Sequence, residues 1–78
     1  QTADLDGLVD SIIRDAIVRH GKPVREMTRE EKLDALEVMA GRGVLMVRGG
    51  VAKVAQALSV SRYTIYNYLE RLRQREGL

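Results

Sequence analysis

Two short runs of apolar residues near the C-terminus, separated by three residues, constrain the fold of this chain more than any other feature. Both keep the i, i+3, i+4, i+7 spacing that lines one face of an α-helix. The first run contains Val51, Val54, Ala55 and Leu58, and the second contains Ile65, Tyr68, Leu69 and Leu72. In the break, Ser61 is a good N-cap and Val60 can form a hydrophobic staple with Ile65. The sequence predicts a short helix, a tight turn, and a longer helix from residue 62 to about residue 75.

Another helix is predicted near the N-terminus. Its apolar stripe consists of Leu5, Leu8, Val9, Ile12, Ile13, Ala16 and Ile17. Asp4 lies near its start, as the helix dipole favours, and Gly21 followed by Pro23 ends it. A stripe this regular must be covered, so either the rest of the domain or the same helix of a second subunit packs on it. A homodimer is therefore one expectation.

A further helix, from residue 29 to about residue 41, opens with a capping box formed by Thr28 and Glu31. After it, four consecutive apolar residues at positions 44–47 are bounded by glycines on both sides. This segment is too short for an ordinary helix, so we expect an extended connector. A strand here would have no partner within the chain, and it would lie on the core or pair across a dimer.

The composition agrees with a small helical protein. The chain has 78 residues, of which 45% are hydrophobic and 31% charged, and it contains no cysteine, phenylalanine or tryptophan. The lack of cysteine excludes disulfides and thiol chemistry, and no apolar run reaches the roughly 18 residues of a membrane span. We expect one all-α domain of four helices in the cytoplasm. Residues 1–28 form its leading helix and linker, and residues 29–78 form its core.

The charge is distributed unevenly along the chain. Residues 1–41 carry six basic and nine acidic side chains, whereas residues 42–78 carry seven basic and only two acidic ones, Glu70 and Glu76. Clustered cations attract polyanions through Coulomb steering and counterion release. A solvated basic face is the alternative, and charge alone does not separate the two.

A short helix, a three-residue turn and a longer helix with a polar outer face describe a helix-turn-helix. Ala55 supplies the small residue that two crossing helices need where they approach most closely, and Val60 is the apolar plug beneath the turn. Ser59 stands where glycine is commonest, and a left-handed backbone conformation there costs it about 1 kcal/mol.

With the apolar stripe facing inward, the start of the last helix presents Arg62, Tyr63, Tyr66, Asn67 and Glu70 outward. Arginine can bond guanine bidentately, asparagine can bond adenine in the same way, and tyrosine hydroxyls can reach phosphate oxygens. Two basic residues flank the start of the preceding helix, where the helix dipole favours a phosphate. The predicted DNA-binding residues are therefore Arg48, Lys53, Ser61, Arg62, Tyr63, Thr64, Tyr66, Asn67 and Arg71.

These residues also have plain structural interpretations. Tyr63 and Tyr66 can pack against a dimer partner, and Tyr68 belongs in the core with its hydroxyl at the rim. Cations before the short helix can serve solubility alone. The arginines at the end of the last helix, which are Arg71, Arg73 and Arg75, form either a solvated helix end or a tail that contacts phosphates.

Three segments carry a family resemblance: EEK at residues 30–32, GVLMVRGGV at 43–51, and VAQALSVSRYTIYNYL at 54–69. Together they resemble the C-terminal helix-turn-helix of YheO-like bacterial transcriptional regulators, the group that includes the D-arginine utilisation repressor. SRYTIYNYL is the most diagnostic piece. The family commonly keeps a phenylalanine and a lysine in the connector, where this chain has Leu45 or Met46 and Arg48. The resemblance implies a DNA-binding domain that follows a PAS-like sensor domain, and with Gln1 in place of a methionine we expect an excised C-terminal fragment.

The function expected from these features is sequence-specific binding of double-stranded DNA by a homodimer, for transcriptional regulation. A recombinase-like or sigma-like DNA-binding module is one alternative, and a helical dimerisation or protein-interaction domain is another. No cofactor, metal or enzymatic activity is expected. His20 is the single histidine, and it lies at a helix end with no second histidine or cysteine to complete a metal site.

Overall fold

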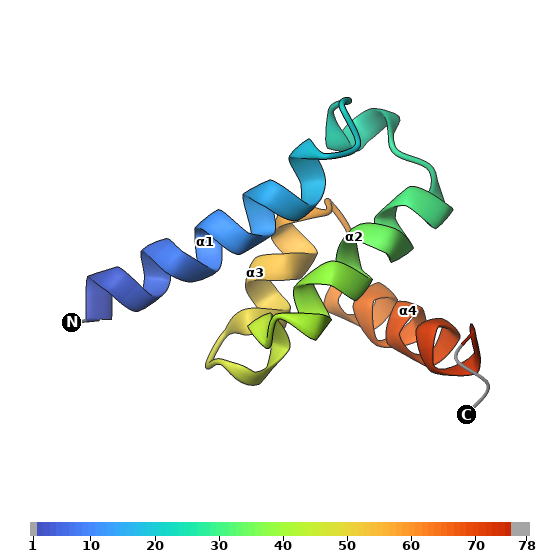
Figure 1. Cartoon of the computed structure of the whole chain (residues 1–78). Helices are drawn as coiled ribbons and strands as arrows, with labels where there is room; N and C mark the ends of the chain where they lie inside the picture. Colours follow the sequence, from blue (N-terminus) through green and yellow to red (C-terminus); the bar gives the residue numbers. More distant parts are fainter. Residues whose placement is uncertain (1, 76–78) are drawn as a thin grey trace.

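The computed structural model of the chain describes residues 2–75, with side chains from Leu5 onward (Figure 1). Asp4, expected near the start of the first helix, and Glu76, counted in the C-terminal charge, have side chains outside the described residues. The elements are α1 (Thr2–Val18), η1 (Val24–Glu26), α2 (Arg29–Gly41), η2 (Val44–Met46), α3 (Gly50–Ala57) and α4 (Arg62–Arg75). The described part contains four α-helices and no strand, which confirms the all-α prediction.

The linker between α1 and α2 is fixed by local hydrogen bonds. α1 ends at Val18, and the N–H groups of His20 and Gly21 donate to carbonyls three residues earlier. Gly21 has a φ of 68°, the left-handed conformation expected of a helix-terminating glycine.

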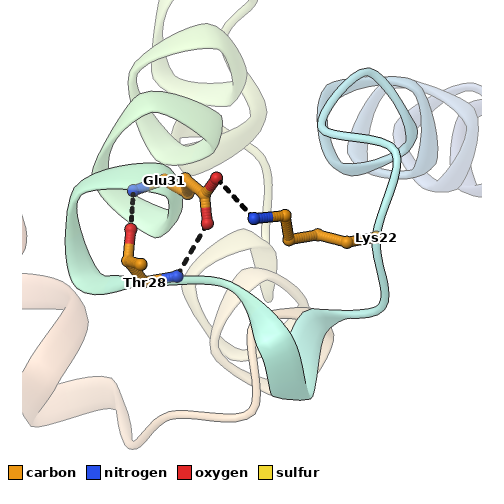
Figure 2. Close-up of polar contacts among 3 residues, drawn as sticks. All are labelled: Lys22, Thr28 and Glu31. Atoms are coloured by element: carbon orange, nitrogen blue, oxygen red, sulfur yellow. Dashed lines mark hydrogen bonds and ion pairs between the residues drawn. The ribbon is translucent and has the colours of Figure 1, made fainter.

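The predicted capping box at the start of α2 is confirmed. The Glu31 N–H donates to Thr28 Oγ1 over 3.1 Å, and the Thr28 N–H donates back to Glu31 Oε1 over 2.8 Å. Lys22 of the linker adds a third contact, because its Nζ donates to Glu31 Oε2 over 2.9 Å (Figure 2). These bonds to the charged carboxylate, first the backbone bond at Thr28 and then the Lys22 bond, lower the pKa of Glu31.

The prediction of an extended connector is wrong, because Val44–Met46 form one turn of 3-10 helix. A lone strand would have left its backbone groups without partners, whereas this turn closes on itself, with the Met46 N–H donating to the Gly43 carbonyl over 3.0 Å. Gly43, with a φ of 84°, reverses the chain before the turn. Val44 is buried and Met46 is exposed, so the connector presents only part of its apolar surface to the core.

The core gathers one face of each α-helix and one residue from each of the linker and connector. Its buried residues are Val9, Ile13, Ala16, Met27, Leu33, Ala35, Leu36, Met39, Val44, Val54, Ala55, Leu58, Ile65 and Leu72. The α1 stripe is covered only in part, because its N-terminal turns project beyond the other helices (Figure 1) and leave Leu5 51% and Leu8 57% exposed.

Gly50 fixes the approach of α3 to the connector. This buried glycine begins α3, and a Cβ atom built on it would lie 2.0 Å from the Val44 carbonyl oxygen. Only glycine permits this approach of backbone to backbone. The connector therefore packs directly against the N-terminal end of α3.

Candidate nucleic-acid interface

The turn between α3 and α4 is a Schellman motif. The Val60 N–H donates to the Ala55 carbonyl over 3.0 Å, and the Ser59 N–H donates to the Gln56 carbonyl over 3.2 Å. Ser59 has a φ of 58° and is the single non-glycine residue with a positive φ in the described part of the chain. The prediction of a left-handed serine at this position is confirmed. The motif ends α3 and turns the chain directly into α4, so the two helices do not form one rod.

Two features hold the start of α4 in place. Ser61 caps the helix, because its Oγ accepts a hydrogen bond from the Thr64 N–H over 3.0 Å. The Thr64 hydroxyl lies 3.1 Å from the same oxygen. Below the cap, Ile65 is fully buried and Val60 packs against the core, as a hydrophobic staple requires. The first turn of α4 is therefore anchored at its cap and at its inner face.

The outward face of the first two turns of α4 is open to solvent. Arg62, Tyr63, Tyr66 and Asn67 are all exposed, and the exposed fractions of Tyr63 and Tyr66 are 76% and 58%. Tyr68, by contrast, is half-buried against the core, as expected. The two exposed tyrosines, together with the arginine and the asparagine, form a protruding surface of polar and aromatic side chains. This surface offers the hydrogen-bond donors and acceptors that contacts with base edges and phosphates require.

The two cations before and within α3 have different surroundings. Arg48 is exposed in the turn before the helix. Lys53 is half-buried, and its Nζ donates to Asp10 Oδ1 of α1 over 3.1 Å. Sequence reasoning missed this contact, since nothing local places residues 43 positions apart side by side. An exposed ion pair of this kind is worth about 0–1 kcal/mol, so Lys53 can exchange the carboxylate for a phosphate.

The arginines at the end of α4 are not equivalent. Arg73 pairs with Glu70 on the same helix. Arg75 donates to Asp34 of α2 over 3.0 Å and lies 4.0 Å from Glu30, and the hydrogen bond to Asp34 raises the pKa of Arg75. Among the described residues, Arg71 forms no ion pair.

The structure brings one further cation to this surface. Arg29, the first residue of α2, lines a shallow hollow of about 570 Å³ together with residues of α4. The α4 residues that line it are Thr64, Asn67, Tyr68, Glu70, Arg71 and Gln74. Arg29 and Gln74 were absent from the sequence prediction, because only the packing of α2 against α4 brings Arg29 to this side.

The remaining features do not add a second site to the described residues. Residues 2–75 contain no group of three or more histidine, cysteine, aspartate or glutamate residues placed to hold a metal ion. Their helices include none that is long and apolar enough to cross a membrane. His20 is half-buried, and its Nε2 has no hydrogen-bond partner in the described structure.

Comparison with known proteins gives one match. Searches of curated proteins and of solved structures return no significant similarity. A family model described as an HTH domain matches residues 8–70, which extend from α1 to the middle of α4. The match includes the capped turn, the outward-facing residues of α4 and the helices that support them. It indicates DNA binding, the activity associated with helix-turn-helix folds. With most of its length covered, the chain belongs to the HTH domain family.

Proposed function

We propose that this chain binds double-stranded DNA in a sequence-specific manner and serves in transcriptional regulation, with the start of α4 in the major groove. The observation that carries the proposal is the exposure of Arg62, Tyr63, Tyr66 and Asn67 on a helix end that the Ser61 cap and the buried Ile65 hold in place. A reading helix needs this combination, because base contacts require both the right side chains and a fixed orientation.

The proposed contacts divide into two kinds. Arg62 and Asn67 read base edges, and the two neighbouring tyrosines share contacts with bases and backbone. Positioning on phosphates falls to the remaining predicted residues, which are Arg48, Lys53, Ser61, Thr64 and Arg71. Their position around α3 and α4 supports this division, with Arg48, Ser61 and Arg71 exposed and Lys53 and Thr64 half-buried.

The chain acts as a homodimer in this proposal. Leu5 and Leu8 lie three residues apart on the exposed part of α1, and an uncovered apolar surface at a helix end is a common site of protein association. Two subunits would place their reading helices about 34 Å apart, in successive major grooves of a pseudo-palindromic site.

On the strength of its sequence resemblance, we assign this domain to the YheO-like group of bacterial regulators, in which it would follow a PAS-like sensor domain. The family match agrees with the helix-turn-helix part of that resemblance. As the DNA-binding end of such a regulator, with residues 1–78 as one domain, the chain would work in the cytoplasm beside the chromosome.

Selection of bound duplexes from a random pool, followed by the molar mass of the purified complex, tests binding, specificity and stoichiometry together. We expect an enriched pseudo-palindromic sequence bound by two chains. Arg62→Ala should remove the preference at one base pair while leaving the others. An unchanged selected sequence for this variant would show that the reading face is assigned wrongly.

Two further measurements, the salt dependence of binding and the oligomeric state of a variant, distinguish DNA binding from a protein-interaction function. A protein-interaction module would retain duplexes only weakly and would lose them at moderate salt, whatever their sequence. The exposed Leu5 and Leu8 are the observation that favours this second candidate. Replacing both leucines by serine further distinguishes a DNA-binding dimer from a protein-interaction module. The DNA-binding dimer should then dissociate into monomers that still bind a half-site.

A further inference from the structure

The hollow between α2 and α4 is lined on one side by a stripe of α4. Thr64, Asn67, Arg71 and Gln74 all line it, and their i, i+3, i+7, i+10 spacing places them along one side of the helix. Asn67 belongs to the proposed reading face as well. The hollow therefore adjoins that face on the side that points toward α2.

Two arginines contribute the positive charge of this hollow. Arg29 comes from α2 and Arg71 from α4, and both are exposed. Neither takes part in any ion pair of the described residues, since the pairs found there involve Lys22, Lys53, Arg73 and Arg75. Both guanidinium groups are thus available to an outside anion.

The carboxylates around the hollow already have partners. Glu70, which also lines it, pairs with Arg73, Glu30 and Asp34 face Arg75, and Glu31 binds Lys22. The capping box also occupies the backbone N–H groups of Thr28 and Glu31. The two guanidinium groups, unpaired among the described residues, are therefore the positive charges that line the hollow.

We infer that Arg29 and Arg71 hold the backbone of one DNA strand against the hollow, each on one phosphate, beside the groove that α4 enters. This inference rests on the proposed function and extends it to a residue outside the helix-turn-helix itself. Guanidinium groups suit phosphate oxygens because they donate two parallel hydrogen bonds. A strand docked there would fix the rotation of α4 about its own axis, since Asn67 on the same stripe is held next to the bases.

Binding of fluorescent duplexes across 50–300 mM KCl tests the inference, with the selected duplex and a scrambled duplex compared for each protein. The variants are Arg29→Ala, Arg71→Ala and the double variant. Arg25→Ala and Arg42→Ala are matched controls, because each removes one exposed arginine that does not line the hollow. Thermal melts by circular dichroism establish that every variant is folded before its binding is compared.

For Arg29→Ala we expect about a tenfold loss of affinity for both duplexes, in line with loss of a charged hydrogen bond. The plot of log affinity against log salt concentration has a negative slope. The magnitude of this slope should decrease by about one for each single variant and by about two for the double variant. Arg29→Lys should keep the slope while recovering only part of the affinity, because lysine retains the charge but not the bidentate geometry.

The outcomes for this inference and for the proposed function are distinguishable. If the unaltered protein binds neither duplex, the proposed function fails. If it binds and Arg29→Ala behaves like Arg25→Ala, DNA binding stands and the role of Arg29 is refuted. A loss confined to the selected duplex would also refute it, because a phosphate contact acts on every sequence alike.

Discussion

Replacing Gly50 by alanine tests whether the close approach of α3 to the connector holds this domain together. The added Cβ would lie 2.0 Å from the Val44 carbonyl oxygen, 3.1 Å from the Val44 carbonyl carbon and 3.3 Å from the Leu45 Cα. All three are backbone atoms, so no side-chain rotation can relieve the overlap. Real Cβ atoms essentially never come within 3.0 Å of another atom, so the connector and α3 must separate by about 1 Å or more.

The loss in the free energy of unfolding can be estimated from the packing that this separation disturbs. Overpacking a well-filled site costs about 1–3 kcal/mol, and we expect the upper end, about 3 kcal/mol, because the obstacle is backbone and because Val44 is only 1% exposed. Domains of this size have a free energy of unfolding of about 4–12 kcal/mol in all. A shift of about 4–8 °C per kcal/mol then predicts a melting temperature lower by about 12–24 °C.

Thermal and urea unfolding followed by circular dichroism measure this effect directly. Gly41→Ala is the matched control, because Gly41 ends α2 with nothing within 4 Å of an added Cβ. Its stability should stay the same or rise by up to about 1 kcal/mol through helix propensity. A melting temperature of Gly50→Ala equal to that of the unaltered protein would refute the packing argument.

The helix ends and the reading face can be tested by single substitutions. Ser59→Gly should raise the free energy of unfolding by about 0.5 kcal/mol in urea melts, since relief of the left-handed strain exceeds the added flexibility of glycine. Because the pKa of Glu31 is lowered, its ionised carboxylate stabilises the folded state above the ordinary carboxyl pKa, and this stabilisation is lost as the pH falls through the lowered value. In urea melts at a series of acidic pH values, the free energy of unfolding of Glu31→Gln should therefore depend less on pH than that of the unaltered protein. Arg62→Ala should cost about 1–3 kcal/mol of binding to the selected duplex and much less to a scrambled one, whereas Lys53→Ala should weaken both equally in the same titration.

The helices and their ends were predictable because the signals that make them are local. Thr28 and Glu31 form a capping box within one turn, and Ser61 caps α4 in the same way. The spacing of apolar residues likewise identified the inner face of α4, and with it the exposed position of Arg62 and Asn67. Each of these features depends on residues within a few positions of each other.

The connector was predicted incorrectly because its local signal is ambiguous. Four consecutive apolar residues at positions 44–47 fit either a short strand or a tight helical turn. Residues outside the segment favour the helical turn over the strand, namely the left-handed Gly43 and Gly50, which lies against the Val44 carbonyl. A strand also needs a partner strand, and the described chain offers none.

The sequence by itself determined the four helices, the capped turn between the last two, and the set of side chains that α4 presents to solvent. The tertiary structure alone decided which cations share a surface. It brought Arg29 beside Arg71, tied Lys53 to Asp10, bound Arg75 to Asp34, and left Leu5 and Leu8 uncovered. The physical reason is range, because capping and periodicity act within a turn or two of helix, whereas contacts between residues some 40 positions apart depend on how the helices pack.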